Sequence, residues 1–313
     1  MRRPTKGVRL VLSSSRITRA LVGAAAAALA AAALTGAAPP TAAAAAAPAA
    51  HGAQPARQHA PDYYVSLGDS LAAGYQPNAG NTDESYTDQL YAKLKKHDPK
   101  LVHIKLGCSG ETTQTMINGG ICSYPGATSQ LNAAVAFLKA HRGQVRYVTL
   151  DIGANNVDGC ATATGLDMTC AAQGIATVGT ELPQITEAVR RAGGWGPQYV
   201  GMNYYDPFLA AWLTGAAGQQ LAKESVTLST SFNGTIQTAL RATGFRLADV
   251  SRTFATDDFT RQVAVPGIGT LPENVAHVCE WTWECTPYHN IHANTLGYGV
   301  IAGVFERVLE HRR

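Results

Sequence analysis

The stretch YYVSLGDSL, residues 63–71, begins as a β-rich run and ends in a tight turn. Aromatic and β-branched side chains over residues 63–67 favour a short strand, and Gly68 ends it. Ser70 then stands where the strand passes into a helix, so its hydroxyl would face the open edge of the sheet. A serine there could attack a carbonyl beside an oxyanion-binding N–H group, or it could simply cap the helix.

Strand and helix alternate along the rest of the chain. Alternating or continuous apolar runs mark the expected strands, and apolar residues at helical spacing mark the expected helices. Alternation over about 250 residues predicts an α/β fold with a parallel sheet, helices on both of its faces, and ligand binding beyond the strand ends. Further strands are expected at 101–106, 146–152, 198–202 and 245–250, and helices at 86–96, 130–140, 182–192, 226–242 and 296–309.

The charge balance of the 313-residue chain differs between its two parts. Residues 1–60 contain seven basic side chains and no acidic one, which leaves 18 Lys and Arg against 22 Asp and Glu in residues 61–313. The net charge of the expected domain is therefore −4, although the whole chain carries +3. A mildly acidic domain argues against binding to nucleic acid, which requires a basic surface.

The N-terminus has the pattern of a secretory signal peptide. A basic leader up to Arg19 precedes the small, apolar run ALVGAAAAALAAAALTGAA at 20–38. A transmembrane anchor is the alternative, but alanine is only weakly hydrophobic and no further span follows. Arg2-Arg3 is a poor twin-arginine signal, which favours the general secretory route. We therefore expect a signal peptide at 1–38, a disordered Ala/Pro-rich linker at 39–60, one domain at 61–313, and an extracellular protein without a membrane span after cleavage.

Six cysteines follow the signal segment, and an even number in an exported chain suggests disulfides. Fifteen pairings are possible for six cysteines. The three sequential pairs close short segments, and no Cys-x-x-Cys or His-rich spacing supports a metal site. We expect no metal or cofactor, and the disulfides Cys108–Cys122, Cys160–Cys170 and Cys279–Cys285.

Three more expected loops or helix starts carry residues suited to ester chemistry. The segment GCSGET at 107–112 contains Gly110, whose N–H could approach a reacting carbonyl oxygen, and GANN at 153–156 contains Asn155, whose amide could donate to the same oxygen. The segment HANTLGY at 292–298 places His292 before the last helix, where it could act as general base for Ser70. Taken singly, each is also compatible with an ordinary turn or a structural histidine.

Together, in this order, the four segments resemble the conserved blocks of the SGNH, or GDSL-type, hydrolase family. The resemblance runs from about Tyr63 to the C-terminus. It implies a flavodoxin-like, three-layer α/β/α sandwich with a five-stranded parallel sheet, and ester hydrolysis through an acyl-enzyme. By the same resemblance, Ser70 is the nucleophile, His292 is the general base, and the N–H groups of Ser70 and Gly110 with the Asn155 side chain form the oxyanion hole.

Two positions depart from the family pattern. Asn156 stands where the family has Asp, and His289-Asn290-Ile291-His292 lacks the aspartate of the D-x-x-H motif. That aspartate normally orients the imidazole and stabilises its positive charge. Some secreted, actinobacterial-type relatives use a main-chain carbonyl here instead, so we expect the carbonyl of His289 to orient His292. A carboxylate from Glu280 or Glu284 is the alternative, and an impaired enzyme is a third.

Flanking segments could complete the substrate site. Trp281 and Trp283 could line an acyl pocket or simply pack within the Cys279–Cys285 loop. The segments 157–180 and 204–207 could border the cleft.

The favoured function is a secreted, monomeric serine esterase or lipase that cleaves carboxylic esters, either lipids or short-chain esters. A polyester (polyhydroxyalkanoate) depolymerase and a phospholipase are alternatives on the same site. A non-catalytic binding protein on a hydrolase fold is the alternative from another class, supported only by the missing aspartate.

Overall fold

A parallel sheet forms the centre of the computed structural model, which describes residues 60–162 and 165–310. The expected signal peptide and nearly all of the linker lie outside the described residues and stay predictions. The five strands follow the order β4-β1-β5-β8-β9, and each neighbouring pair is parallel. They are β1 (Asp62–Gly68), β4 (Leu101–Lys105), β5 (Val145–Asp151), β8 (Gln198–Met202) and β9 (Arg246–Ala248).

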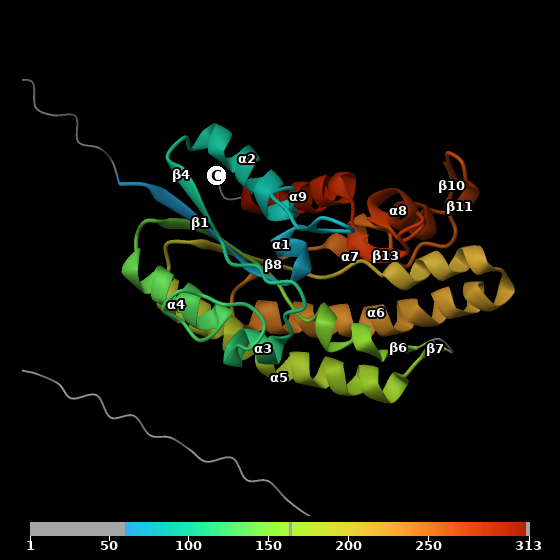
Figure 1. Ribbon diagram of the computed structural model, residues 1–313, viewed down its shortest axis with the longest axis horizontal. Helices are drawn as coiled ribbons and strands as arrows, with labels where there is room; N and C mark the ends of the chain where they lie inside the picture. Colours follow the sequence, from blue (N-terminus) through green and yellow to red (C-terminus); the bar gives the residue numbers. More distant parts are fainter. Residues whose placement is uncertain (1–59, 163–164, 311–313) are drawn as a thin grey trace, which may run out of the picture. The chain divides into compact units, whose positions relative to one another are not determined.

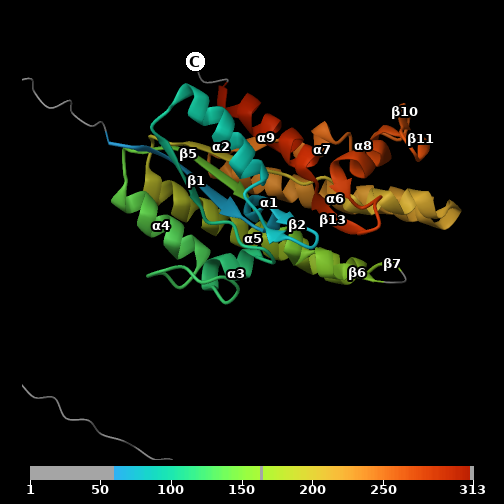
Figure 2. The same cartoon turned by 45° about the horizontal axis from the view of Figure 1, so that its top comes forward.

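Helices cover both faces of this sheet (Figure 1). The helices α2 (Tyr86–His97) and α9 (Thr295–Glu310) lie side by side on one face. The other face is covered by α3 (Thr113–Asn118), α4 (Gln130–Ala140), α5 (Met168–Gly193) and α6 (Ala216–Ala242), and Figure 2 shows the same two layers after rotation. The expected α/β/α sandwich and its five-stranded sheet are confirmed.

Shorter elements stand mainly in the connections. The helical ones are α1 (Ser70–Ala73), α7 (Val250–Thr253), α8 (Glu273–Trp281), and the 3₁₀ turns η1 (Ala154–Asn156), η2 (Asp158–Cys160) and η3 (Pro207–Thr214). The two-stranded antiparallel ribbons are β2 (Tyr75–Gln76) with β3 (Gly80–Asn81), β6 (Ala161–Thr162) with β7 (Gly165–Leu166), β10 (Gln262–Val265) with β11 (Gly269–Pro272), and β12 (Thr282–Trp283) with β13 (Asn290–Ala293).

The central strands are buried on both faces, as in a parallel sheet that helices cover on both sides. Val65, Leu67, Val148, Leu150 and Val200 are all at most 2% exposed. Their burial removes large apolar areas from water, at roughly 25 cal/mol for each Å². The sheet is thus a rigid base, and the connections after β1, β4, β5 and β8 share one edge of it.

Two helices begin earlier than the apolar spacing predicts. The expected helix 182–192 extends over α5, and the expected helix 226–242 extends over α6. α5 continues through Pro183, although a proline inside a helix removes one main-chain hydrogen bond. Much of the segment 157–180 therefore belongs to α5, while Val157 and Asp158 at its start border the pocket beside Ser70.

Candidate active site

Ser70 is positioned by the turn between β1 and α1. Asp69, not Ser70, is the helix N-cap, since its side chain accepts a hydrogen bond from the N–H of Leu71 at 3.0 Å. The Ser70 hydroxyl is therefore free for other contacts. Gly68 has a φ of 152°, and a Cβ atom there would lie 2.2 Å from Asp151 Oδ1, so the turn requires glycine.

His292 lies on β13, which reaches the same sheet edge from the far end of the sequence. Its Nε2 atom lies 2.8 Å from Ser70 Oγ, and its Nδ1 atom lies 2.7 Å from Asn290 Oδ1. The same oxygen accepts the main-chain N–H of His292 at 3.1 Å. Because Oδ1 can only accept, Nδ1 carries the proton and Nε2 accepts the hydroxyl proton of Ser70. The structure thus brings the predicted serine and histidine within hydrogen-bond distance of each other.

The expected orienting group at His289 is wrong, because the partner of Nδ1 is the side chain of Asn290. Asparagine side chains commonly bond to groups two residues ahead, and Asn290 does this twice with His292. The alternatives Glu280 and Glu284 do not take this position either. Asn290 lies within residues 289–292, the segment that corresponds to the D-x-x-H motif. Its polar side chain was therefore the feature of the sequence that could have indicated a partner for His292.

The His292 ring is largely enclosed. Tyr75 packs against it with 4.4 Å between ring centroids. Burial disfavours the charged imidazolium and lowers the pKa of His292 to about 4. The neutral imidazole, which is the form a general base requires, is thus the dominant form of the resting site near neutral pH.

The loops after β4 and β5 meet beside Ser70. Asn155 lines the same pocket as Ser70, and its Nδ2 atom donates to the carbonyl of Glu111 at 2.9 Å. Asn156 accepts from the N–H of Thr113 at 3.0 Å, which ties η1 to the start of α3. The two asparagines therefore hold the loop of Gly110 in place. The Asn156 departure from the family pattern is thus compatible with a structural role.

A buried carboxyl pair lies under the nucleophile turn, and sequence reasoning missed it. Asp151, at the end of β5, accepts the N–H groups of Asp69 and Ala72, both at 3.3 Å, and the hydroxyl of Tyr86. Asp69 accepts the hydroxyl of Tyr204 at 2.7 Å. Burial raises the pKa of both carboxyls, and the negative charge of Asp69 raises that of Asp151 further. This network fixes the backbone that carries Ser70.

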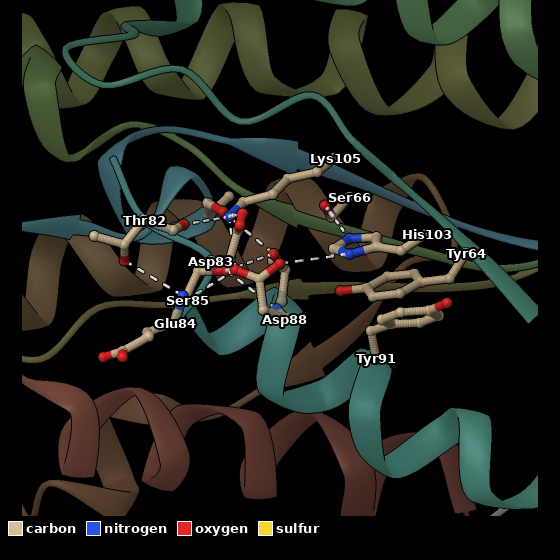
Figure 3. A network of polar contacts seen from close by, with 12 residues as sticks. Tyr64, Ser66, Thr82, Asp83, Glu84, Ser85, Asp88, Tyr91, His103 and Lys105 are labelled. Atoms are coloured by element: carbon tan, nitrogen blue, oxygen red, sulfur yellow. Dashed lines mark hydrogen bonds and ion pairs between the residues drawn. The ribbon is translucent and has the colours of Figure 1, made fainter. Parts of the chain in front are cut away.

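A second group of serine, histidine and aspartate side chains is formed by residues of β1, β4 and α2 (Figure 3). Ser66 Oγ lies 2.8 Å from His103 Nε2, and His103 Nδ1 lies 3.7 Å from Asp88 Oδ1. Ser66 is 0% exposed, so no substrate reaches its hydroxyl. Asp88 is held by Lys105 Nζ at 2.6 Å. The network therefore connects the edge strand β4 to α2 and is not a second active site.

The structure pairs the six cysteines as expected. Cys108–Cys122 closes the loop that carries Gly110, and Cys279–Cys285 closes the segment before His292. Cys160–Cys170 joins η2 to α5. Among the described residues, no group of His, Cys, Asp and Glu side chains is arranged to hold a metal ion.

The two tryptophans of the Cys279–Cys285 region have packing roles. Trp281 stacks on His277 at 3.9 Å and meets the edge of Phe254 at 4.9 Å. Trp283 donates its ring N–H to Gln76 at 2.6 Å. Neither lines the pocket beside Ser70, whereas Tyr204, Tyr205 and the other residues of segment 204–207 do.

Comparison with known proteins identifies the family. The model of the GDSL-like Lipase/Acylhydrolase family matches residues 66–300. The chain belongs to this family. It is therefore a carboxylic ester hydrolase of the lipase and esterase kind.

Solved structures share the fold. The extracellular lipase of Streptomyces rimosus is 17% identical, with a TM-score of 0.52 over 79% of this chain and 99% of its own. A protein from Parabacteroides merdae described as a GDSL-like lipase is 13% identical, with a TM-score of 0.50 over 80% of this chain and 95% of its own. No curated protein matches the chain. At these identities, the similarity extends to the fold alone.

Proposed function

We propose that this chain is a secreted serine esterase or lipase that hydrolyses carboxylic esters through an acyl-enzyme on Ser70. One observation carries the proposal: Ser70 Oγ lies 2.8 Å from His292 Nε2 at the edge of a pocket with largely apolar walls. Nucleophile and base at hydrogen-bond distance, with the base oriented by a third group, form the arrangement that activates a hydroxyl.

The reaction follows from the proton positions at rest. Ser70 Oγ attacks the carbonyl carbon while its proton passes to His292 Nε2. The imidazolium then returns this proton to the departing alcohol, and the acyl group stays on Ser70. Water attacks the acyl-enzyme with its proton moving to Nε2, and the acid leaves as Ser70 recovers its proton.

The negatively charged oxygen that forms during the attack must be stabilised by hydrogen-bond donors. The main-chain N–H groups of Ser70 and Gly110 and the Asn155 amide are the proposed set. The bond from Asn155 to the carbonyl next to Gly110 supports this assignment, because it links two of the three donors. Loss of one such donor lowers turnover by about 100- to 1,000-fold in a well-studied serine protease.

Asn290 replaces the aspartate of the usual triad in this proposal. Its oxygen selects the productive tautomer of His292 and fixes the ring toward Ser70. A neutral amide stabilises the imidazolium less than a carboxylate would. The site thus retains the orienting part of the triad and gives up part of the charge stabilisation.

Disulfides and the N-terminal pattern support export. All six cysteines are paired, as is usual for proteins that function outside the cytosol. Within the described residues, the helices lack the length and apolar character of a membrane span. The mass of the mature N-terminus in the culture medium tests the expected removal of residues 1–38.

The decisive assay is hydrolysis of p-nitrophenyl esters with acyl chains from acetyl to palmitoyl, by the protein and by Ser70→Ala. We expect the variant to lose at least about 1,000-fold in kcat/KM while it keeps its thermal unfolding profile. The chain-length optimum separates esterase from lipase. Activity on polyester films and on phospholipids tests the two other substrates.

Two results would count against this function. Equal activity of Ser70→Ala would assign the chemistry to another residue. A folded, fully oxidised protein without activity on any ester would favour a binding protein on a hydrolase fold.

A further inference from the structure

The pocket beside the Ser70–His292 pair has a specific composition. It contains about 670 Å³ of space between protein atoms, part of it open to solvent. Aromatic rings form much of the wall, namely Tyr204, Tyr205, Phe208 and Phe232.

Carboxyl groups are the other notable feature of the pocket. Asp69, Asp158 and Asp206 line it, and the lining includes no Lys or Arg. Asp69 already accepts from Leu71 and Tyr204, and Asp206 accepts from the Ser225 hydroxyl at 2.6 Å. Asp158 differs from both, since none of the described residues donates a hydrogen bond to its carboxyl group.

The tyrosine hydroxyls of the wall are already engaged elsewhere. Tyr204 donates to Asp69, and Tyr205 donates to the carbonyl of Ile291 at 2.7 Å. These two residues therefore offer the pocket their rings rather than a hydrogen-bond donor for Asp158. Aromatic rings attract cations through their negative faces.

Two of the carboxyl groups of the pocket have pKa values close to neutral pH. Burial raises the pKa of Asp206 to about 6, which leaves this group mainly ionised at neutral pH. Burial and the negative charge of Asp69 raise the pKa of Asp158 to about 7. A hydroxyl would satisfy one lone pair of Asp158 but would leave the negative charge uncompensated. A positive group would supply both a donor and the opposite charge.

We propose that this pocket binds an ammonium group of the ester substrate, with Asp158 as its counter-ion and the surrounding aromatic rings as its walls. The substrate class is thus an ester with a cationic group on its alcohol or acyl part. Esters with a carboxylate or phosphate in the same place would be disfavoured, because the lining residues include three carboxyl groups and neither Lys nor Arg. This inference rests on the proposed function of Ser70.

Matched pairs of esters test the proposal. For the alcohol side, butyrylcholine is compared with the neutral ester in which a carbon atom replaces the trimethylammonium nitrogen. For the acyl side, the p-nitrophenyl ester of trimethylammoniobutyrate is compared with its carbon isostere. The readout is the ratio of kcat/KM for the cationic ester to that for its neutral isostere. Because the two esters have the same size and shape, this ratio reports the effect of the charge alone.

We expect this ratio to be at least about tenfold in one of the two pairs, and that pair tells which part of the ester enters the pocket. Asp158→Asn keeps the size of the side chain and removes its charge, so the ratio should fall several-fold, to the preference that the aromatic rings and Asp206 supply. Asp257→Asn removes an exposed carboxylate that does not line the pocket, and should leave the ratio unchanged.

The outcomes separate the two proposals. Ser70-dependent hydrolysis of the neutral esters with no preference for either cation would overturn the ammonium site and leave the esterase intact. A cation preference of undiminished size in Asp158→Asn would overturn the role of Asp158. No Ser70-dependent hydrolysis of any of the four esters would overturn the proposed function and this inference with it.

Discussion

At the scale of single residues, the orientation of His292 depends on one side-chain amide. Asn290 Oδ1 accepts two hydrogen bonds from the histidine, one from its ring and one from its main chain. A carboxylate at this position would raise the pKa of the imidazole through its charge, whereas an amide orients the ring without that effect. The pKa of His292, lowered to about 4 by burial, reflects this lack of a negative partner.

Asn290→Asp should therefore move the acid limb of the pH profile of kcat/KM. In the natural protein, we expect activity to fall only near pH 4, where His292 becomes protonated. The aspartate variant should lose activity at a higher pH, because its carboxylate stabilises the imidazolium. The measurement is kcat/KM on a neutral p-nitrophenyl ester across the acidic range.

Asn294→Ala is the matched control for this experiment. The Asn294 side chain donates to the carbonyls of Glu280 and Thr282 and does not contact the imidazole. Its loss should reduce stability and leave the acid limb in place. Identical acid limbs for Asn290→Asp and the natural protein would contradict the orienting role of Asn290.

Gly68→Ala tests the turn that carries Ser70. The added methyl group meets Asp151 and requires a positive φ, so we expect a loss of unfolding free energy of at least roughly 1–3 kcal/mol. Urea unfolding measures this loss. Gly267→Ala shares the positive φ but has no heavy atom within 4 Å of the added Cβ, so it separates backbone strain from the clash. Equal losses in both variants would contradict a clash with Asp151.

Sequence reasoning pointed to residues that belong to local motifs. Ser70 and His292, which the structure places within hydrogen-bond distance, could be named because each follows or precedes a regular element at a recognisable turn. Asp151 was missed because its partners Tyr86 and Asp69 are distant in sequence, and only the sheet register brings them together. Asn290 was missed because a side chain that reaches two residues ahead resembles any polar loop residue.

At the scale of elements, the strand β13 needs support because it is only four residues long. It pairs with β12, and the disulfide Cys279–Cys285 closes the segment that contains β12. Tyr205 adds a hydrogen bond to the main chain of Ile291 at 2.7 Å. The position of His292 thus depends on contacts made by several different elements.

The double variant Cys279→Ser, Cys285→Ser should lower the free energy of unfolding by roughly 2 kcal/mol, as the chain-entropy model gives for so short a loop. Without the disulfide, the segment that contains β12 is no longer closed, and β12 pairs with the strand that carries His292. We therefore expect kcat to fall as well. Urea unfolding and p-nitrophenyl ester turnover measure the two effects. A variant with unchanged stability and unchanged kcat would show that hydrogen bonds alone hold β13.

Helix lengths were predicted less well than helix positions. The first half of α5 is rich in Thr, Gly and Ala, which gave no clear apolar stripe, yet Ala171 and Val178 are fully buried against the rest of the domain. Tertiary packing therefore extends this helix beyond what its local sequence favours. The strand bounds agreed within a few residues because continuous apolar runs mark covered parallel strands.

At the scale of the whole molecule, buried carboxyls shape the dependence of stability on pH. The pKa of Asp158 is raised to about 7 in the folded state, above its value in the unfolded chain. A group of this kind stabilises the fold while protonated, and that contribution is lost as pH rises through about 7. His103 and His292 act in the opposite direction, because their pKa values near 4 cost stability as pH falls below about 6.5.

Asp158→Asn should therefore stabilise the protein more at about pH 8 than at about pH 5, since only the ionised carboxylate is unfavourable without a partner. Thermal unfolding at both pH values measures the difference. Asp257→Asn, at an exposed position outside the pocket, is the matched control. A constant difference in Tm between Asp158→Asn and the natural protein would contradict the raised pKa.

The positions of Ser70 and His292 along the sequence determine when, during synthesis, the protein can become active. The hydrogen bond between Ser70 and His292 spans 222 residues, and the histidine lies on the last strand. A ribosome therefore releases the nucleophile long before it releases the base. Nascent chains and products of premature termination that end before His292 carry the serine turn but no general base, so esterolysis begins only after His292 has been synthesised and folded.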